Sequence, residues 1–119
     1  MTPDAAIGSL NRQLRKHGHD AILRRSTWSG TERADFEVGV RITLRGYRPD
    51  EIIGGIMQGD SEVVLAPTQL RAEGWPSGEA ELPRQGDTIV SAGRPRSVVG
   101  VDPRFIGDTL VRINLQVRG

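Results

Sequence analysis

The clearest pattern of hydrophobic and polar positions is a strict alternation near the middle of the chain. From Phe36 to Leu44 every second residue is apolar, and the residues between are charged, polar or glycine. Successive side chains of a strand point to opposite faces of a sheet, so this pattern predicts a strand with one buried and one wet face. Segment 109–118 alternates in the same way. Its apolar positions are Val111, Ile113, Leu115 and Val117.

Shorter apolar segments between turn residues predict further strands. They cover about 21–28, 61–66, 87–92 and 95–102. Gly93-Arg94 is predicted as a tight turn, and the chain from Asp102 to Asp108 as a longer one. About six short strands favour a mainly β fold, a small antiparallel β-barrel or sandwich.

A short helix is predicted for residues 1–18, where Thr2 suits the N-cap and Gly18 is expected to end the helix in a left-handed conformation. Its apolar face consists of Ile7, Leu10 and Leu14. This narrow face predicts that the helix lies on a surface, either of its own barrel or of a neighbouring subunit. One or two short helical turns are predicted after Asp50, running toward Met57, and over 67–73.

Composition limits the classes of protein and site. The chain has 119 residues, which predicts a single domain over 1–119. It has no cysteine, which excludes disulfides, thiolate metal sites and a cysteine nucleophile. The net charge of +1 provides no global attraction for nucleic acid. The polar N-terminus and the lack of a long apolar run predict a protein made in the cytosol, with no membrane partner.

Three groups of residues were considered as sites for chemistry. The segment His17 to Asp20 contains metal-ligand types, but a charged helix end explains it better. The acidic pairs Asp50-Glu51 and Asp60-Glu62 suit helix caps and turns better than acid–base catalysis. Neither a nucleophile elbow nor a phosphate-binding glycine loop occurs. We therefore predict no catalytic residues, no cofactor, no metal and no enzymatic activity.

Exposed loops and turns supply the remaining candidates. Segments 49–60 and 74–82 are predicted to be exposed loops, and the first is the candidate assembly or channel loop. Its residues of interest are Pro49, Asp50, Glu51, Gly54, Gly55, Met57 and Asp60. Arg84, Arg94 and Arg96 are candidate contacts to DNA or a partner, although solvated turn charges are the alternative interpretation. Aromatic residues make up 4% of the chain, too few for a base-stacking platform.

The C-terminal third resembles a known family. It contains a strand opening with Gly86-Asp87, a Gly-Arg-x-Arg hairpin at 93–96, Val-Val-Gly-Val-Asp-Pro at 98–103 and a final Leu-Gln-Val-Arg-Gly at 115–119. These features are similar to the head-closure, or stopper, proteins of the neck of long-tailed bacteriophages and prophages, also called head–tail joining or connector proteins. The similarity extends more loosely through 45–51 and 58–65.

The resemblance implies a structural virion protein without catalysis. It implies a β-barrel subunit that forms a homo-oligomeric ring beneath the portal and adaptor proteins, seals the packaged DNA and presents a docking face to tail proteins. It also implies location in the virion neck after synthesis in the bacterial host cytoplasm. Two alternatives stay open: a tail-terminator or minor tail protein, and a small β-barrel module that binds a ligand or nucleic acid.

Overall fold

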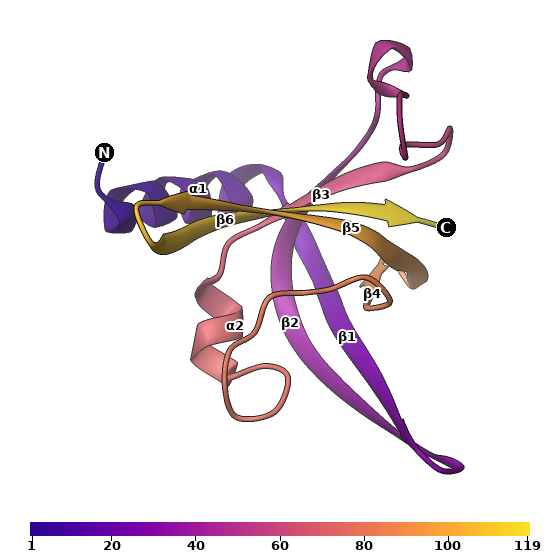
Figure 1. Cartoon of the computed structure of the whole chain (residues 1–119). Helices are drawn as coiled ribbons and strands as arrows, with labels where there is room; N and C mark the ends of the chain where they lie inside the picture. Colours follow the sequence, from indigo (N-terminus) through magenta and orange to yellow (C-terminus); the bar gives the residue numbers. More distant parts are fainter.

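The alternating segments form the strands of one closed antiparallel barrel. The computed structural model describes residues 1–119. The strands are β1 (His19–Ser29), β2 (Glu32–Gly46), β3 (Ser61–Leu65), β4 (Thr88–Ser91), β5 (Arg94–Ile106) and β6 (Thr109–Arg118). They are arranged around the barrel in the order β1-β2-β3-β6-β5-β4 (Figure 1). The predicted mainly β class, with about six strands and a short N-terminal helix, is confirmed.

The predicted inward faces form the core. In β6 the four alternating apolar residues from Val111 to Val117 are buried, and in β2 the same holds for Val38, Val40 and Ile42. All of these except Val111 meet the inward residues of β1, β3, β4 and β5 in a single cluster. A shift of one residue in pairing would turn each apolar set outward, so the burial pattern fixes the register of the strands.

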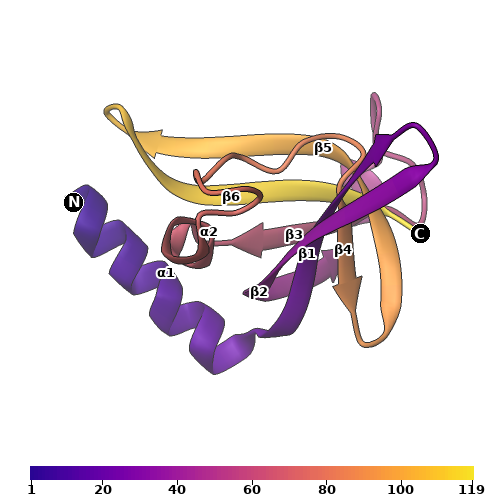
Figure 2. The same cartoon turned by 90° about the horizontal axis from the view of Figure 1, so that it is seen from below.

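Helix α1 (Pro3–His17) lies along the outside of the barrel (Figure 2). The Thr2 hydroxyl caps it by accepting a hydrogen bond from the Ala5 amide at 3.1 Å. Its buried residues Leu10 and Leu14 form a second apolar cluster with Val64 and Ala66. The helix therefore packs on its own barrel, one of the two surfaces that its apolar face predicted. Neither α1 nor the second helix has the length and apolar content to span a membrane.

Gly18 has a different role from the predicted one. Its backbone is extended, with φ −91° and ψ −174°, so it is not a left-handed helix end. Instead it allows close approach, because a Cβ here would lie 2.5 Å from the carbonyl oxygens of Leu14 and Ile42. We expect Gly18→Ala to lower the free energy of unfolding by about 1–2 kcal/mol by forcing α1 away from β2. Chemical denaturation would measure this, with Gly8→Ala inside the helix as control; equal effects of both variants would contradict the explanation.

Several turns also differ from the prediction. The tight turn consists of Ala92 and Gly93, both with positive φ, rather than Gly93-Arg94. The predicted long turn is wrong, because β5 continues through Pro103 to Ile106. Beyond Val98 it pairs with β6 alone, and a strand with one free edge accommodates proline. The helix expected after Asp50 is only a 3₁₀ turn, η1 (Pro49–Glu51).

The second predicted loop contains a core residue. Helix α2 (Thr68–Glu73) ends at Gly74, which has the left-handed conformation of a helix C-cap. The chain then places Trp75 in the core with 2% of its surface exposed, while residues 77–82 are exposed. The Trp75 indole N–H donates to the Phe36 carbonyl oxygen at 2.8 Å. The prediction of an exposed loop is thus wrong for Trp75, whose large apolar ring packs into the barrel core.

Two segments project from the barrel in different directions (Figure 1). The first is the arm, residues 26–35, which forms the end of the β1–β2 hairpin and is exposed at every position. It has no third strand, since β4 pairs only with 22–24 and β3 only with 42–46. The second is the 49–60 loop between β2 and β3. Both offer surface that no other element of the chain covers.

Candidate functional site

One buried carboxylate holds the 49–60 loop. Asp60 is 3% exposed and accepts four hydrogen bonds. Arg118 donates to it twice, from Nε at 2.8 Å and Nη2 at 2.9 Å, and Gln116 Nε2 donates at 2.7 Å. The fourth donor is the Met57 amide at 2.9 Å. Gln116 also donates to the Gly55 carbonyl oxygen at 3.1 Å, so the last strand fastens both the end and the middle of the loop.

The charges around the loop stabilise ionised carboxylates. Hydrogen bonds from Arg118 hold the pKa of Asp60 well below its usual range, with further contributions from Met57 and Gln116. At the start of the loop, Arg45 donates to Glu51 at 3.0 and 3.1 Å and lowers the pKa of Glu51 to about 2. Both ends of the loop are therefore attached to the barrel by arginine–carboxylate contacts.

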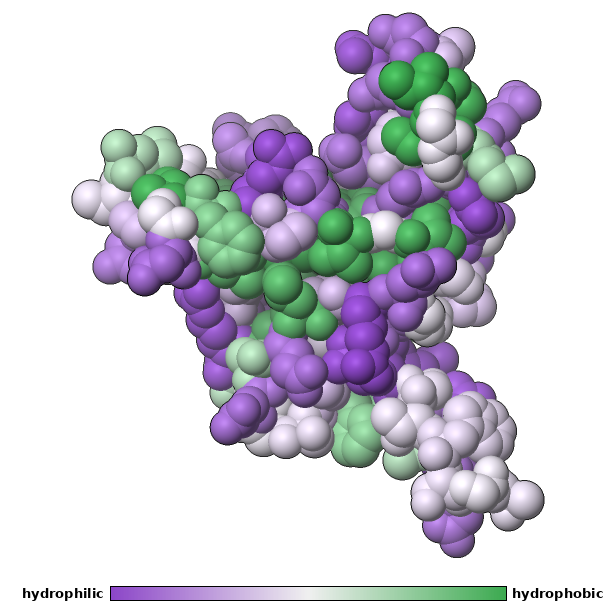
Figure 3. Space-filling view, viewed as in Figure 1, coloured by the Kyte–Doolittle hydropathy of each residue, from purple (hydrophilic) through white to green (hydrophobic).

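The tip of the loop is apolar and exposed. Ile53 is 71% exposed and Met57 is 57% exposed, with Gly54 and Gly55 between them. Figure 3 shows apolar surface gathered on this projection. Pro49, Asp50 and Glu51 form the 3₁₀ turn at its base. The seven predicted loop residues thus divide into a base, an exposed tip and a buried anchor at Asp60. The expectation that the whole segment is exposed is wrong for Asp60, which is buried because β6 supplies its donors.

The three predicted arginine contacts do not have equivalent environments. Arg84 and Arg94 are exposed. Arg96 is half-buried; it is paired with Ile89 on the inward side of the sheet, and its Nε is buried without a hydrogen-bond partner. Arg96 Nη1 lies 3.5 Å from the Gly119 carbonyl oxygen, beside the C-terminal end of the chain. Arg94 and Arg96 therefore do not form the pair of solvated hairpin charges that their spacing suggested.

A buried ion pair is the main feature missed by sequence reasoning. Arg25 and Asp87 are 4% and 2% exposed, and Arg25 donates to both carboxylate oxygens at 3.0 and 2.9 Å. Arg25 also donates to the Leu82 carbonyl oxygen at 3.0 Å and lies 4.7 Å from the centre of the Trp75 ring. These contacts attach the 74–87 segment to β1. They make the segment part of the barrel rather than a free loop.

Two residues of metal-ligand type just after α1, His19 and Asp20, contact other side chains. His19 Nε2 shares a hydrogen bond with the Ser91 hydroxyl at 2.7 Å, and Asp20 accepts from Arg41 at 3.2 Å. Nowhere in the chain do three or more histidine or acidic side chains come together in a metal-binding arrangement. The acidic residues of the 49–60 loop likewise contact arginines: Asp50 lies 3.6 Å from Arg48, and Glu51 and Asp60 are held by Arg45 and Arg118.

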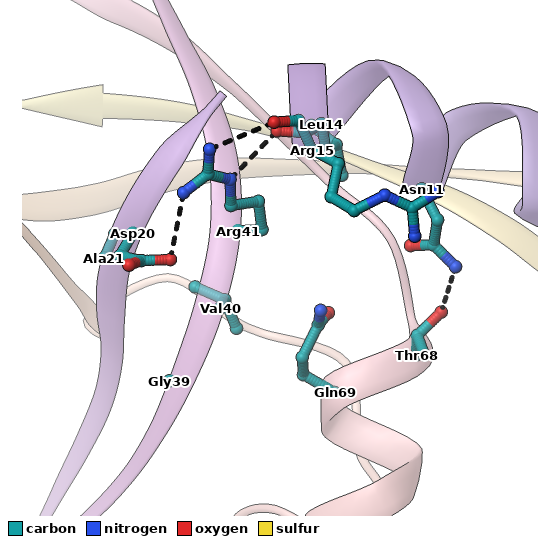
Figure 4. A pocket seen from close by; sticks show the side chains of 10 residues that line it. All are labelled: Asn11, Leu14, Arg15, Asp20, Ala21, Gly39, Val40, Arg41, Thr68 and Gln69. Atoms are coloured by element: carbon teal, nitrogen blue, oxygen red, sulfur yellow. Dashed lines mark hydrogen bonds and ion pairs between the residues drawn. The ribbon is translucent and has the colours of Figure 1, made fainter. Parts of the chain in front are cut away.

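A polar hollow of about 430 Å³ separates α1, α2 and the β1–β2 sheet (Figure 4). On its upper side Arg41 donates to the carbonyl oxygens of Leu14 and Arg15 at 3.0 and 3.2 Å, and so caps the end of α1. On the opposite side Asn11 donates to the Thr68 hydroxyl at 2.9 Å and joins the two helices. These contacts fix the position of α1 on the barrel.

No protein-family model matches the chain, and no curated protein matches it. Its candidate surfaces therefore rest on its own geometry. The arm and the end of the β5–β6 hairpin have strand edges that pair with no third strand. The two projections carry the exposed large side chains Trp28, Ile53 and Met57. Such an arrangement is suited to contacts with other macromolecules, because exposed apolar side chains on projecting segments are typical of interfaces.

Proposed function

We propose that this chain is a structural protein of the phage neck, a head-closure protein that joins head to tail. It assembles as a ring of identical subunits beneath the portal and adaptor proteins and seals the packaged DNA. The protein would then be located in the neck of the virion. Support for the neck comes from the sequence resemblance of segments 86–103 and 109–119. Support for an assembly role comes from the two projections on a closed barrel, one with an apolar tip and the other with a single exposed tryptophan.

The observation that carries the proposal is the anchored loop with an apolar tip. Asp60 and Glu51 fix the loop at its two ends, while Ile53 and Met57 remain exposed between them. A segment that is fixed in this way loses little further conformational freedom when it binds, so its contacts contribute more fully to affinity. In the proposal this tip contacts a neighbouring subunit, the adaptor or a tail protein. The exposed Arg84 and Arg94 provide non-specific contacts to DNA.

The test is genetic and structural. The gene is expected to lie between portal or capsid genes and tail genes. Deleting it should leave filled or leaking heads beside free tails in electron micrographs. A plasmid copy of the wild-type gene should restore joined particles, and a copy with Ile53→Asp and Met57→Asp should not. Both substitutions lie at exposed positions, so the variant should fold.

The matched control is Glu79→Ala, an exposed substitution in the 74–82 segment that should restore joining fully. Normal infectious particles after the deletion would refute the proposal. Imaging of labelled particles would separate the neck from the alternative, a tail-terminator or minor tail protein. Label at the far end of the tail tube or along it would replace the neck assignment by that alternative.

A further inference from the structure

Trp28 lies near the end of the arm and has no role in the core. It is 67% exposed, belongs to neither apolar cluster and faces only Arg33 across the hairpin. A two-stranded ribbon without a third strand is marginally stable, and its exposed tryptophan is not part of the barrel core. Tryptophan is also among the residues that contribute most to protein–protein binding when buried. The position of Trp28 is therefore that of an anchor residue for a partner.

An apolar cleft on the same chain has the size of one large side chain. Its volume is about 250 Å³, below the range of about 300–1,000 Å³ that is typical of small-molecule sites. Its apolar lining consists of Pro67, Leu70, Ala80, Leu82, Phe105 and Leu110. Leu82 and Phe105 are exposed, although they are large apolar residues. In Figure 3 a band of apolar surface crosses the face that carries β5 and β6.

One charged side chain beside Trp28 and one at the cleft are complementary and unpaired, whereas the other charge at the cleft, Glu81, lies 3.5 Å from Arg25 of its own chain. Glu32, which pairs with Ser29 at the end of the arm, has no basic partner in the chain. Arg71 lines the cleft and has no acidic partner; its Nη2 donates only to the Leu110 carbonyl oxygen at 3.0 Å. An unpaired carboxylate beside the anchor and an unpaired guanidinium beside the cleft would form an ion pair on docking. Such pairs select the correct partner and orientation.

We propose that Trp28 of one copy inserts into this cleft of a second copy, with Glu32 of the arm contacting Arg71 of the cleft. The arm extends away from its own barrel, so the cleft it fills is that of another copy (Figures 1 and 2). Arm and cleft are different surfaces, so the contact is head-to-tail and can propagate into a closed ring. The choice of a second copy as the partner rests on the proposed function, in which identical subunits form a ring. The inference identifies the contact between neighbouring subunits of that ring.

The cysteine-free chain allows a direct cross-linking test. Ser29→Cys on the arm and Ala80→Cys at the cleft are both exposed substitutions. On oxidation of an equimolar mixture, the heterodimer should exceed the sum of the two homodimers, which it would only equal if the chains paired at random. The double variant should give a ladder of covalent multimers. Adding Trp28→Ala to the Ser29→Cys chain should lower the heterodimer yield about tenfold or more, as expected for loss of an anchor residue.

Exchanging the two charges tests the contact independently. Glu32→Arg on one chain or Arg71→Glu on the other should each reduce the heterodimer, and the two together should restore it. The control mixture joins Ile53→Cys on the 49–60 loop with Ala80→Cys. The inference would be overturned if the Ser29→Cys and Ala80→Cys chains gave no more heterodimer than this control mixture. It would also be overturned if Trp28→Ala left the heterodimer yield unchanged, or if the chains did not associate at all.

The inference and the proposed function can fail separately. Suppose that phage with the gene deleted fail to join heads to tails, but phage that carry Trp28→Ala join them normally. This result would refute the arm–cleft contact and leave the neck function standing. A deletion without effect on particles, together with specific Ser29→Cys and Ala80→Cys cross-links, would refute the neck function and leave the contact between copies standing.

Discussion

Replacing Asp87 with alanine is expected to lower the free energy of unfolding by about 3–5 kcal/mol, the cost of leaving a buried charge without its partner. Arg25 is 4% exposed, and Asp87 supplies its two shortest carboxylate contacts. The remaining neighbours of Arg25 are the Leu82 carbonyl oxygen, the ring of Trp75 and a more distant Glu81 carboxylate at 3.5 Å. The long contact to the exposed Glu81 does not replace the two short bonds to Asp87.

Urea denaturation followed by tryptophan fluorescence would measure this change, because Trp75 lies against Arg25. Glu37→Ala is the matched control: it removes the partner of Arg24 in a pair at the surface, where about 0–1 kcal/mol is expected. Replacing both partners, as Arg25→Met with Asp87→Leu, should cost less than Asp87→Ala alone. A loss for Asp87→Ala no larger than that of the control would show that Arg25 reaches water when Asp87 is removed.

The strands could be predicted because their signal is local. Side chains of a strand alternate between its two faces, and one face of β2 and of β6 is buried. Apolar residues are therefore required at every second position of these strands. The same signal continues at Arg25, which follows the inward positions Ala21 and Leu23 of β1. A charge at an inward position is the sign of a buried pair, but its partner Asp87 is 62 positions away along the chain. Sequence spacing contains no information about a contact at that distance.

The contacts that hold the 49–60 loop could not be predicted from the sequence for a related reason. Gln116 and Arg118 occupy outward positions of β6, where alternation predicts solvated side chains. The barrel order places β6 beside β3, which follows the loop, so these side chains meet Asp60 rather than water. The tip residues Ile53 and Met57 were within the predicted segment, whereas Trp28 was assigned to a strand and not to a site. Trp28 is exposed because neither β3 nor β4 extends along the arm, which the local sequence does not show.

Replacing Asp60 with asparagine is the second change with a large expected effect. The amide keeps the size of the side chain but removes the charge that accepts two bonds from Arg118. Loss of these charged hydrogen bonds should lower the free energy of unfolding by about 2–3 kcal/mol. Hydrogen exchange should also accelerate at the Met57 amide, which donates to Asp60. Glu62→Gln is the control, since Glu62 meets Arg45 at 3.3 Å on an exposed surface.

The contribution of Asp60 should also depend on pH in a defined direction. Arg118 lowers the pKa of Asp60 in the folded chain, so the ionised form is bound more strongly than in the unfolded chain. Its stabilisation is complete above the unfolded value of about 4 and is lost as the pH falls toward the folded value. The difference between the wild type and Asp60→Asn should therefore shrink steadily from about pH 5 to about pH 2 in denaturation measurements. A difference that stays constant over this range would mean that Asp60 holds the loop through the shape of its side chain rather than its charge.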